Sequence, residues 1–320
     1  METRRDVIVR TAVLADELGY EIFALPEGWG LDPAPVLTEI ALRTTRIRLA
    51  SGILSVWGRT PATLAMTAAT LHQVCGGRYV LGLGASTKAL VEGFHDTAFE
   101  HPAAKLRDVV TKVRALLAGQ PAQLGHVAAA RPLRLGQPPV PGLPIWIAAL
   151  GQHTMNVAAE LGDGWIPALM ARDQVAAWAK RLGQRRETAA PHAPALTVAA
   201  GPIAVADEDP GTARDIAAAC AAWYLSAMGD VYARSLAGQG YAAEVSAIIA
   251  ANPRPSPRRG IIPPEAGVVL DQLAACGTPG QVREQLEAWD DVADVVTFML
   301  PPGLPWDTVE ATLRAAAPGA

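Results

Sequence analysis

Short apolar segments of strand length alternate with helical segments along most of this chain. The apolar segments mostly lack a strict polar alternation, which is typical of strands buried on both faces of a parallel sheet. Several of the helical segments end at a glycine, the residue that most easily adopts the left-handed backbone after a helix. The pattern predicts seven strands, at residues 22–25, 47–53, 79–84, 145–150, 165–169, 196–205 and 295–300.

Helices are predicted between these strands from their apolar spacing and from the residues that begin them. Residues 4–18 carry apolar side chains on one helical face and precede Gly19. Thr278 followed by Pro279 predicts another helix start, because Thr suits the N-cap and Pro the first turn. The remaining predicted helices cover residues 35–43, 61–74, 104–118, 153–161, 212–228 and 241–251.

Strands and helices alternate through 320 residues with no composition break that would mark a linker. This favours one α/β domain over residues 1–320, a (β/α)8 TIM barrel. The first barrel strand is missing from the pattern, because the chain opens directly with a helix. Either the true start lies upstream, or the first barrel position is unfilled or filled in another way. Residues 207–267 are expected to form a helical and loop insertion before the last strand, over the mouth of the barrel.

Composition and charge narrow the class of protein. The net charge is −4 and basic residues do not cluster, so we expect no nucleic-acid surface. No apolar run approaches the ~20 residues that a membrane-spanning helix needs, and the charged, periodic start is not a signal peptide. Cys75, Cys220 and Cys276 form no CxxC motif. We therefore expect a cytoplasmic protein with no membrane contact and no metal site.

A barrel places its active site at the carboxyl ends of its strands. The residues there are mostly small or neutral, with no Ser-His-Asp order, no HExxH motif and no carboxylate pair with divided roles. Glycines, hydroxyls and tryptophans in these positions suit a large flat cofactor that brings its own chemistry. Gly82-Leu83-Gly84 lacks the spacing of a dinucleotide-binding or P-loop turn. Its glycines either allow crowding inside a narrow barrel or let the backbone lie against a ligand.

Four motifs in a fixed order carry a resemblance to a known family. They are T-x-R-I-R-L-x-S-G from Thr44, R-x-P-A-x-x-A from Arg59, GGR-x-x-LGLGA from Gly76 and GDGW from Gly162. Together they resemble the bacterial luciferase-like monooxygenases, and most of all the deazaflavin (F420)-dependent oxidoreductases among them. Ordered matches extend over most of residues 14–170, and residues 276–282 are similar to a helix start late in the family's sequences.

The resemblance implies a luciferase-like barrel with an insertion before its last strand and a ring lying across the barrel mouth. In the family the ring rests on a bulge with a non-proline cis peptide, which maps to Gly52-Ile53. The phosphate-side contacts map to Gly84-Ala85-Ser86 and to residues 151–154, where a helix start with free N–H groups suits a phosphate. Trp29 and Met170 are candidate substrate contacts. The implied cofactor contacts are Ser51, Gly52, Ile53, Gly84, Ala85, Ser86, Gly151, Gln152, His153 and Thr154.

The chain departs from the family where relatives often carry a proton-transferring Asp-His or an Arg-His-Pro. It has Glu27-Gly28-Trp29 and Arg59-Thr60-Pro61 in these places. Glu27 either replaces the missing acid or pairs locally, and Trp57 is the second candidate catalytic residue.

The expected function is F420-dependent hydride transfer to or from a C=C, C=N or C=O group of a small organic substrate. The alternatives are an FMNH2-dependent monooxygenase and a non-catalytic barrel that binds a ligand or partner. The resemblance also implies a homodimer.

Overall fold

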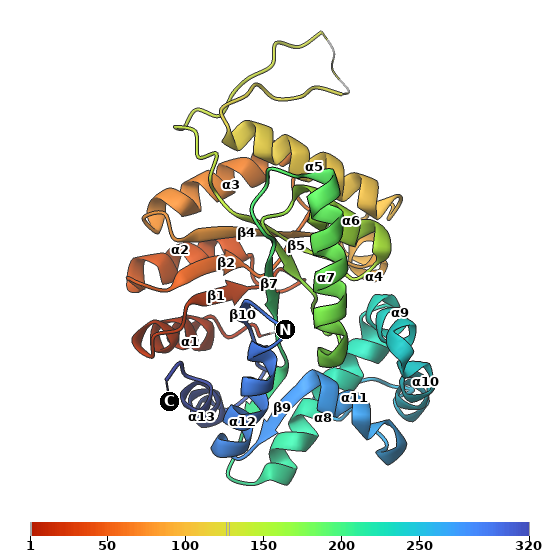
Figure 1. The fold of residues 1–320 in the computed structure, drawn as a ribbon. Helices are drawn as coiled ribbons and strands as arrows, with labels where there is room; N and C mark the ends of the chain where they lie inside the picture. Colours follow the sequence, from red (N-terminus) through yellow and green to blue (C-terminus); the bar gives the residue numbers. More distant parts are fainter. Residues whose placement is uncertain (1, 126, 128, 320) are drawn as a thin grey trace.

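Parallel strands form one curled sheet in this computed structural model, which describes residues 2–125, 127 and 129–319. The sheet order is β1-β2-β4-β5-β6-β7-β10, and β3 pairs with β4 beside β2 (Figure 1). The strands run across the sheet in the order in which they occur in the sequence, as in a TIM barrel. The strands are β1 (Ile22–Leu25), β2 (Arg48–Ser51), β3 (Leu54–Ser55), β4 (Tyr79–Gly84), β5 (Ile145–Ala148), β6 (Gly164–Ile166), β7 (Thr197–Ala200) and β10 (Val295–Val296).

The helices that wrap this sheet begin at capping residues. The start expected at Thr278 is confirmed, whereas the helix expected from residue 35 begins two residues earlier, at Pro33. Asp32 accepts the N–H of Ala34 at the start of α2, Thr60 caps α3, and Thr278 forms a capping box at the start of α12. No helix among the described residues is both long and apolar enough to cross a membrane. The helices around the sheet are α1 (Arg5–Glu17), α2 (Pro33–Arg43), α3 (Pro61–Val74), α4 (Lys88–Gly93), α5 (Pro102–Leu117), α6 (Gln152–Leu161), α7 (Arg172–Ala189), α12 (Pro279–Asp290) and α13 (Trp306–Ala315).

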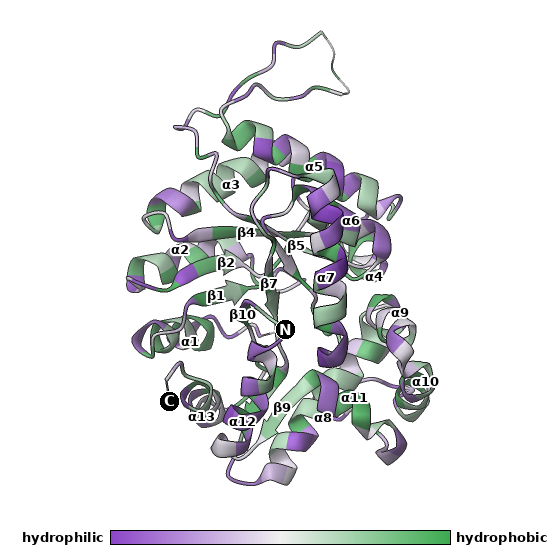
Figure 2. Ribbon diagram, in the orientation of Figure 1, coloured by the Kyte–Doolittle hydropathy of each residue, from purple (hydrophilic) through white to green (hydrophobic). Residues whose placement is uncertain are grey.

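The sheet stays open between β1 and β10, the position of the missing first strand. No ladder joins these two strands in the described part of the chain. The helical layer is nevertheless continuous there, because Leu14 of α1 packs with Val309 and Leu313 of α13. Figure 2 shows the strands mainly in the hydrophobic colour, while hydrophilic residues gather on outer helices such as α7. A curled, luciferase-like barrel is therefore confirmed, and the described residues place no strand at its first position.

The strand predicted over residues 196–205 is wrong as a single strand. β7 ends at Ala200, and β8 (Ile203–Ala206) pairs instead with β9 (Ala274–Gly277) in a second small sheet. The break falls at Gly201-Pro202, where proline has no N–H for a ladder. A Cβ at residue 201 would overlap the backbone of Thr297, which crosses at this point. The strand expected at residues 295–300 is shorter: β10 pairs with β7 at Val295 and Val296, and beyond it an isolated bridge joins Met299 to Ile203.

A helical layer follows β8 and packs against the small sheet. It comprises α8 (Pro210–Ala227), α9 (Val231–Leu236), α10 (Ala242–Ala251) and α11 (Gly267–Leu273). Figure 1 shows α9 beside the lower end of α7, next to the barrel. The insertion expected over residues 207–267 is thus mainly helical, and it ends with β9, which the sequence pattern did not predict.

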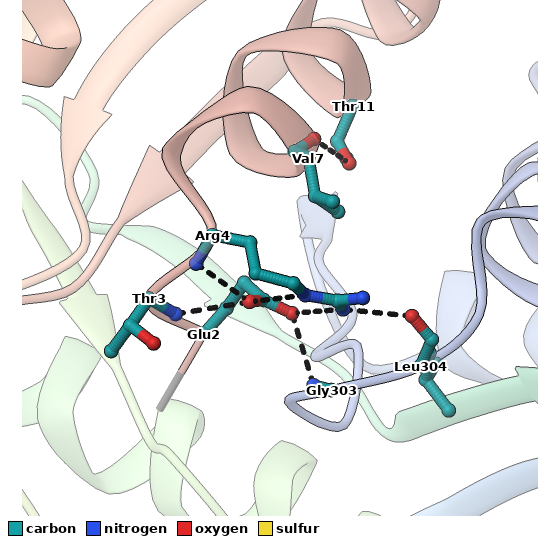
Figure 3. A network of polar contacts seen from close by, with 7 residues as sticks. All are labelled: Glu2, Thr3, Arg4, Val7, Thr11, Gly303 and Leu304. Carbon is teal, nitrogen blue, oxygen red and sulfur yellow. Dashed lines mark hydrogen bonds and ion pairs between the residues drawn. The ribbon is translucent and has the colours of Figure 1, made fainter.

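The first residues of the chain are tied to the loop that follows β10 (Figure 3). Glu2 Oε2 accepts the Gly303 N–H at 3.0 Å, and Arg4 Nη2 donates to the Leu304 carbonyl at 2.7 Å. Glu2 and Arg4 also form an ion pair at 2.6 Å. Burial alone would raise the pKa of Glu2, but the contacts with Arg4 and Gly303 outweigh it and lower the pKa to about 2. The Glu2 carboxylate therefore holds the loop directly at Gly303, and it pairs with Arg4, which makes the second contact at Leu304.

We expect Glu2→Gln to lower the free energy of unfolding by about 1 kcal/mol at neutral pH, a partly screened surface value. Because the pKa of Glu2 lies below its ordinary 4.5, this stabilisation is complete above pH 4.5 and is lost as pH falls toward 2. Urea unfolding at several pH values measures the difference between wild type and variant. Glu17→Gln, on the exposed face of α1, should show no such dependence. A Glu2→Gln difference that stays constant with pH would contradict the assignment.

Candidate active site

A bulge interrupts the pairing of β2 and β3 with β4. Ala50 lies opposite Val80, whereas Leu54 lies opposite Leu83. Three residues, 51–53, therefore face two residues of β4. One extra residue in one strand is the definition of a β-bulge, a feature often found beside active sites. The bulge implied by the family resemblance is present at the expected place.

The cis peptide expected within this bulge is wrong, because the described residues contain no cis peptide bond. The extra residue is accommodated instead by Ile53, whose φ is 135°. This conformation is unfavourable for a β-branched side chain. Two backbone hydrogen bonds hold it: the Gly52 N–H donates to the Leu25 carbonyl at 2.7 Å, and the Glu27 N–H donates to the Ile53 carbonyl at 3.1 Å.

The glycines of β4 are explained by crowding against this bulge. A Cβ on Gly82 would overlap the Ser51 carbonyl oxygen, and one on Gly84 would lie 2.6 Å from Ile53 Cγ2. A Cβ on Gly52 would likewise meet Pro26 N at 2.9 Å. Ser51 is fully buried, and its Oγ accepts the Gly82 N–H at 2.8 Å and donates to the Gly82 carbonyl at 3.0 Å. The Ser51 hydroxyl is therefore used inside the sheet.

The two candidate catalytic residues lie beside the bulge. Glu27 accepts the Ser55 N–H and is ion-paired with Arg59, which is the local pairing that the sequence left open as an alternative. Trp57 donates from Nε1 to the Ala85 carbonyl at 2.9 Å, and this bond fixes its indole over the end of β4. Ala85 and Ser86 follow β4, and Ser86 has a left-handed φ of 61°.

A cavity of about 990 Å³ lies at the carboxyl end of β5, the strand that pairs with the other side of β4. Gly84 pairs with Ala148, and the cavity begins where β5 ends. Five predicted site residues line it: Gly151, Gln152, His153, Thr154 and Met170. The prediction did not include other lining residues, among them Arg107, Trp178, Arg185 and Gln239.

The cavity is suited to an anion. The N-termini of α5 and α6 both border it, and their N-caps, His101 and Gly151, supply no side-chain hydrogen bond to the first turn. The N–H groups of a first helical turn have no partner within the helix and carry a partial positive charge. Arg107 and Arg185 also line the cavity and share one carboxylate, Glu160. Burial alone would raise the pKa of Glu160, but its hydrogen bonds with both arginines lower it.

Tertiary packing alone brings these basic residues together. Arg107 and Arg185 lie on α5 and α7, on either side of α6, and no motif marks them. Trp29 does not line the cavity: the residue is 46% exposed, and its ring is tilted by 49° against that of Trp223 of α8, with 6.2 Å between the ring centroids. In the described ranges, no three His, Cys, Asp or Glu residues gather as a metal site would require.

Comparison with known proteins matches residues 2–294 to the family described as luciferase-like monooxygenase. A Mycobacterium tuberculosis protein, provisionally named a coenzyme F420-dependent oxidoreductase, is 27% identical over 89% of this chain and 87% of its own. The fold is similar to that of the coenzyme F420-dependent tetrahydromethanopterin reductase from Methanopyrus kandleri, with a TM-score of 0.73 at 19% identity over 98% of this chain and 94% of the other. It is also similar to the FMN complex of the oxygenating constituent of 3,6-diketocamphane monooxygenase from Pseudomonas putida, with a TM-score of 0.68 at 16% identity over 99% and 94%.

Proposed function

Because this chain belongs to the luciferase-like monooxygenase family, we propose that it is an oxidoreductase that uses the deazaflavin F420 to transfer a hydride to or from a small organic substrate. One observation carries the proposal. The bulge at residues 51–53 and the cavity at the N-termini of α5 and α6 both lie at the carboxyl ends of strands of the same parallel sheet. The relative from Mycobacterium tuberculosis, which aligns over most of this chain, supports F420 over FMN.

The two parts of the site fit the two ends of such a cofactor. F420 and FMN each carry a flat tricyclic ring and a phosphate. Backbone and small side chains at the bulge and at Gly84 can lie against a ring. The helix N-termini with Arg107 and Arg185 can hold a phosphate. The cavity volume of about 990 Å³ also suits a ligand of this size.

When bound, F420 supplies or accepts the hydride. The residues of this chain would orient the ring and exclude water from it. Trp57, fixed by its bond to Ala85, would cover one side of the ring, and Met170 would supply an apolar wall. The insertion reaches the cavity through Val231 and Arg234, so it would contribute to the choice of substrate.

Titration of the purified protein with F420 and with FMN, followed by cofactor fluorescence, tests the proposal. We expect saturable binding of F420 that is tighter than binding of FMN. The deazaflavin that lacks the phosphate and its tail is the matched control ligand. It should bind about 10–100-fold more weakly than F420, because it loses charge-assisted hydrogen bonds at the helix N-termini.

The alternatives give different results in the same titration. Tighter binding of FMN, with oxygen consumption after reduction, would indicate the monooxygenase alternative. Binding of neither cofactor would indicate the non-catalytic barrel. Equal binding of F420 and its phosphate-free form would contradict the assignment of the cavity to the phosphate.

A further inference from the structure

The carboxylate of Glu27 is engaged on both of its oxygens. Glu27 follows β1 after Pro26, and its side chain is only 10% exposed. Its Oε2 accepts the Ser55 N–H at 2.6 Å. Its Oε1 is ion-paired with the guanidinium of Arg59, which is 14% exposed. Both contacts are made with the segment that contains and follows the bulge, so the carboxylate is turned toward that backbone.

The backbone of Glu27 holds the same segment through a further contact. Its N–H donates to the Ile53 carbonyl at 3.1 Å. Ile53 needs this support, because a φ of 135° is unfavourable for a β-branched residue. Glu27 therefore binds this segment on both sides of Leu54. Its amide donates to Ile53, and its carboxylate accepts from Ser55.

Arg59 extends this support to helix α2. Its Nη2 pairs with Asp32 Oδ1 at 2.9 Å, and the same oxygen accepts the Ala34 N–H at 3.0 Å where α2 begins. Burial alone would lower the pKa of Arg59, but Glu27 and Asp32 raise it, so the guanidinium stays charged. Arg59 thus joins the bulge to the first turn of a packed helix.

From these contacts we propose that Glu27 and Arg59 form a positioning pair that fixes the bulge as a rigid seat for the cofactor ring, and that Glu27 is not the proton donor. The inference rests on the proposed function, since it needs a flat ring to lie on the bulge. A general acid must present a transferable proton to the substrate. The Glu27 oxygens are instead occupied by Ser55 and Arg59, within the protein.

The pair can be tested first without any cofactor, by amide hydrogen exchange. Glu27→Gln and Arg59→Met should each speed the exchange of the Ser55 amide, which donates to Glu27, by about tenfold or more through local opening of the bulge. Glu21→Gln is the matched control. It breaks a 3.0 Å ion pair with Arg48 where β1 and β2 begin, whereas the bulge lies where they end. It should leave Ser55 exchange unchanged.

Cofactor binding gives the second readout. Each of the two variants should raise the Kd for F420 about tenfold. The Kd of the double variant should not exceed the higher of the two single-variant values, because both residues act through one contact. Arg59→Lys keeps the charge and should restore part of the affinity. The pH profile of kcat should keep its wild-type shape in Glu27→Gln.

Other outcomes overturn the proposal. A loss of turnover of about 100-fold or more in Glu27→Gln, with unchanged Kd and Ser55 exchange, would make Glu27 the proton donor. Loss of one limb of the pH profile would lead to the same conclusion. If the wild type binds neither F420 nor FMN, the proposed function fails separately. Ser55 exchange would still show whether Glu27 and Arg59 hold the bulge.

Discussion

Gly201→Ala is expected to lower the free energy of unfolding by about 3 kcal/mol or more, at or above the upper end of the usual cost of overpacking. The added methyl would overlap the Thr297 carbonyl group. Neither backbone segment can move aside freely. The Thr297 N–H donates to the Ala200 carbonyl and the Met299 N–H to the Pro202 carbonyl, both at 2.9 Å. The last strand would have to separate from β7. Urea unfolding followed by circular dichroism measures the loss.

Gly183→Ala is the control for this substitution. Gly183 lies within α7, and an added Cβ there meets no heavy atom within 4 Å. Alanine in a helix interior is favoured over glycine by about 0.5–1 kcal/mol, so this variant should be as stable as wild type or more stable. If Gly201→Ala unfolds at the same urea concentration as Gly183→Ala, Thr297 does not cross the chain at residue 201.

Gly82→Ala is expected to lower stability by about 2–3 kcal/mol and to weaken cofactor binding about tenfold or more, a binding cost of ~1.4 kcal/mol. Its methyl would overlap the Ser51 carbonyl oxygen. Ser51 cannot withdraw, since its hydroxyl holds both the N–H and the carbonyl of residue 82. The bulge would be pushed away from β4. Urea unfolding and F420 fluorescence titration measure the two effects separately.

Gly93→Ala provides the comparison for Gly82→Ala. Gly93 ends α4, close in sequence to the same strand, and no atom lies within 4 Å of an added Cβ. Both stability and cofactor affinity should stay near the wild-type values. A Gly82→Ala protein that is destabilised but binds F420 normally would show that the bulge does not form the ring site.

Local signals explain the elements that were predicted correctly. β1 and β4 have the predicted bounds, Ile22–Leu25 and Tyr79–Gly84, because each is a short apolar run ended by proline or glycine. α3 begins and ends as predicted, since Thr60 and Pro61 specify its first turn. These signals act within a few residues of the element that they define.

The misread elements depend on partners far away in the sequence. Residues 196–205 read as one strand because nothing local shows that Thr297 crosses at Gly201. β9 was missed because the sequence next to it carries a helix, and its partner β8 lies about 70 residues earlier. The cis peptide was expected from family resemblance, but the extra residue of the bulge is accommodated by the φ of Ile53.

The candidate site divides in the same way. Residues 151–154 were selected as a helix start after a strand, and they do line the cavity. Arg107 and Arg185 carry no signal in the sequence, because they reach the cavity only through the packing of α5 and α7 on either side of α6. For Glu27 the sequence left two roles open, and the distances to Ser55 and Arg59 favour local pairing.

By itself, the sequence determined the alternation of strands and helices, the parallel barrel class, the family resemblance and the residues at the strand ends. These follow from apolar periodicity, capping residues and short motifs, which are properties of neighbouring residues. Only the tertiary structure decided that the sheet stays open beside β1 and that β8 pairs with β9 in a second sheet. It also decided that Glu27 contacts Ser55 and Arg59 beside the bulge. Each of these depends on contacts between distant segments, whose free energy is set by packing and hydrogen bonding after the chain has folded.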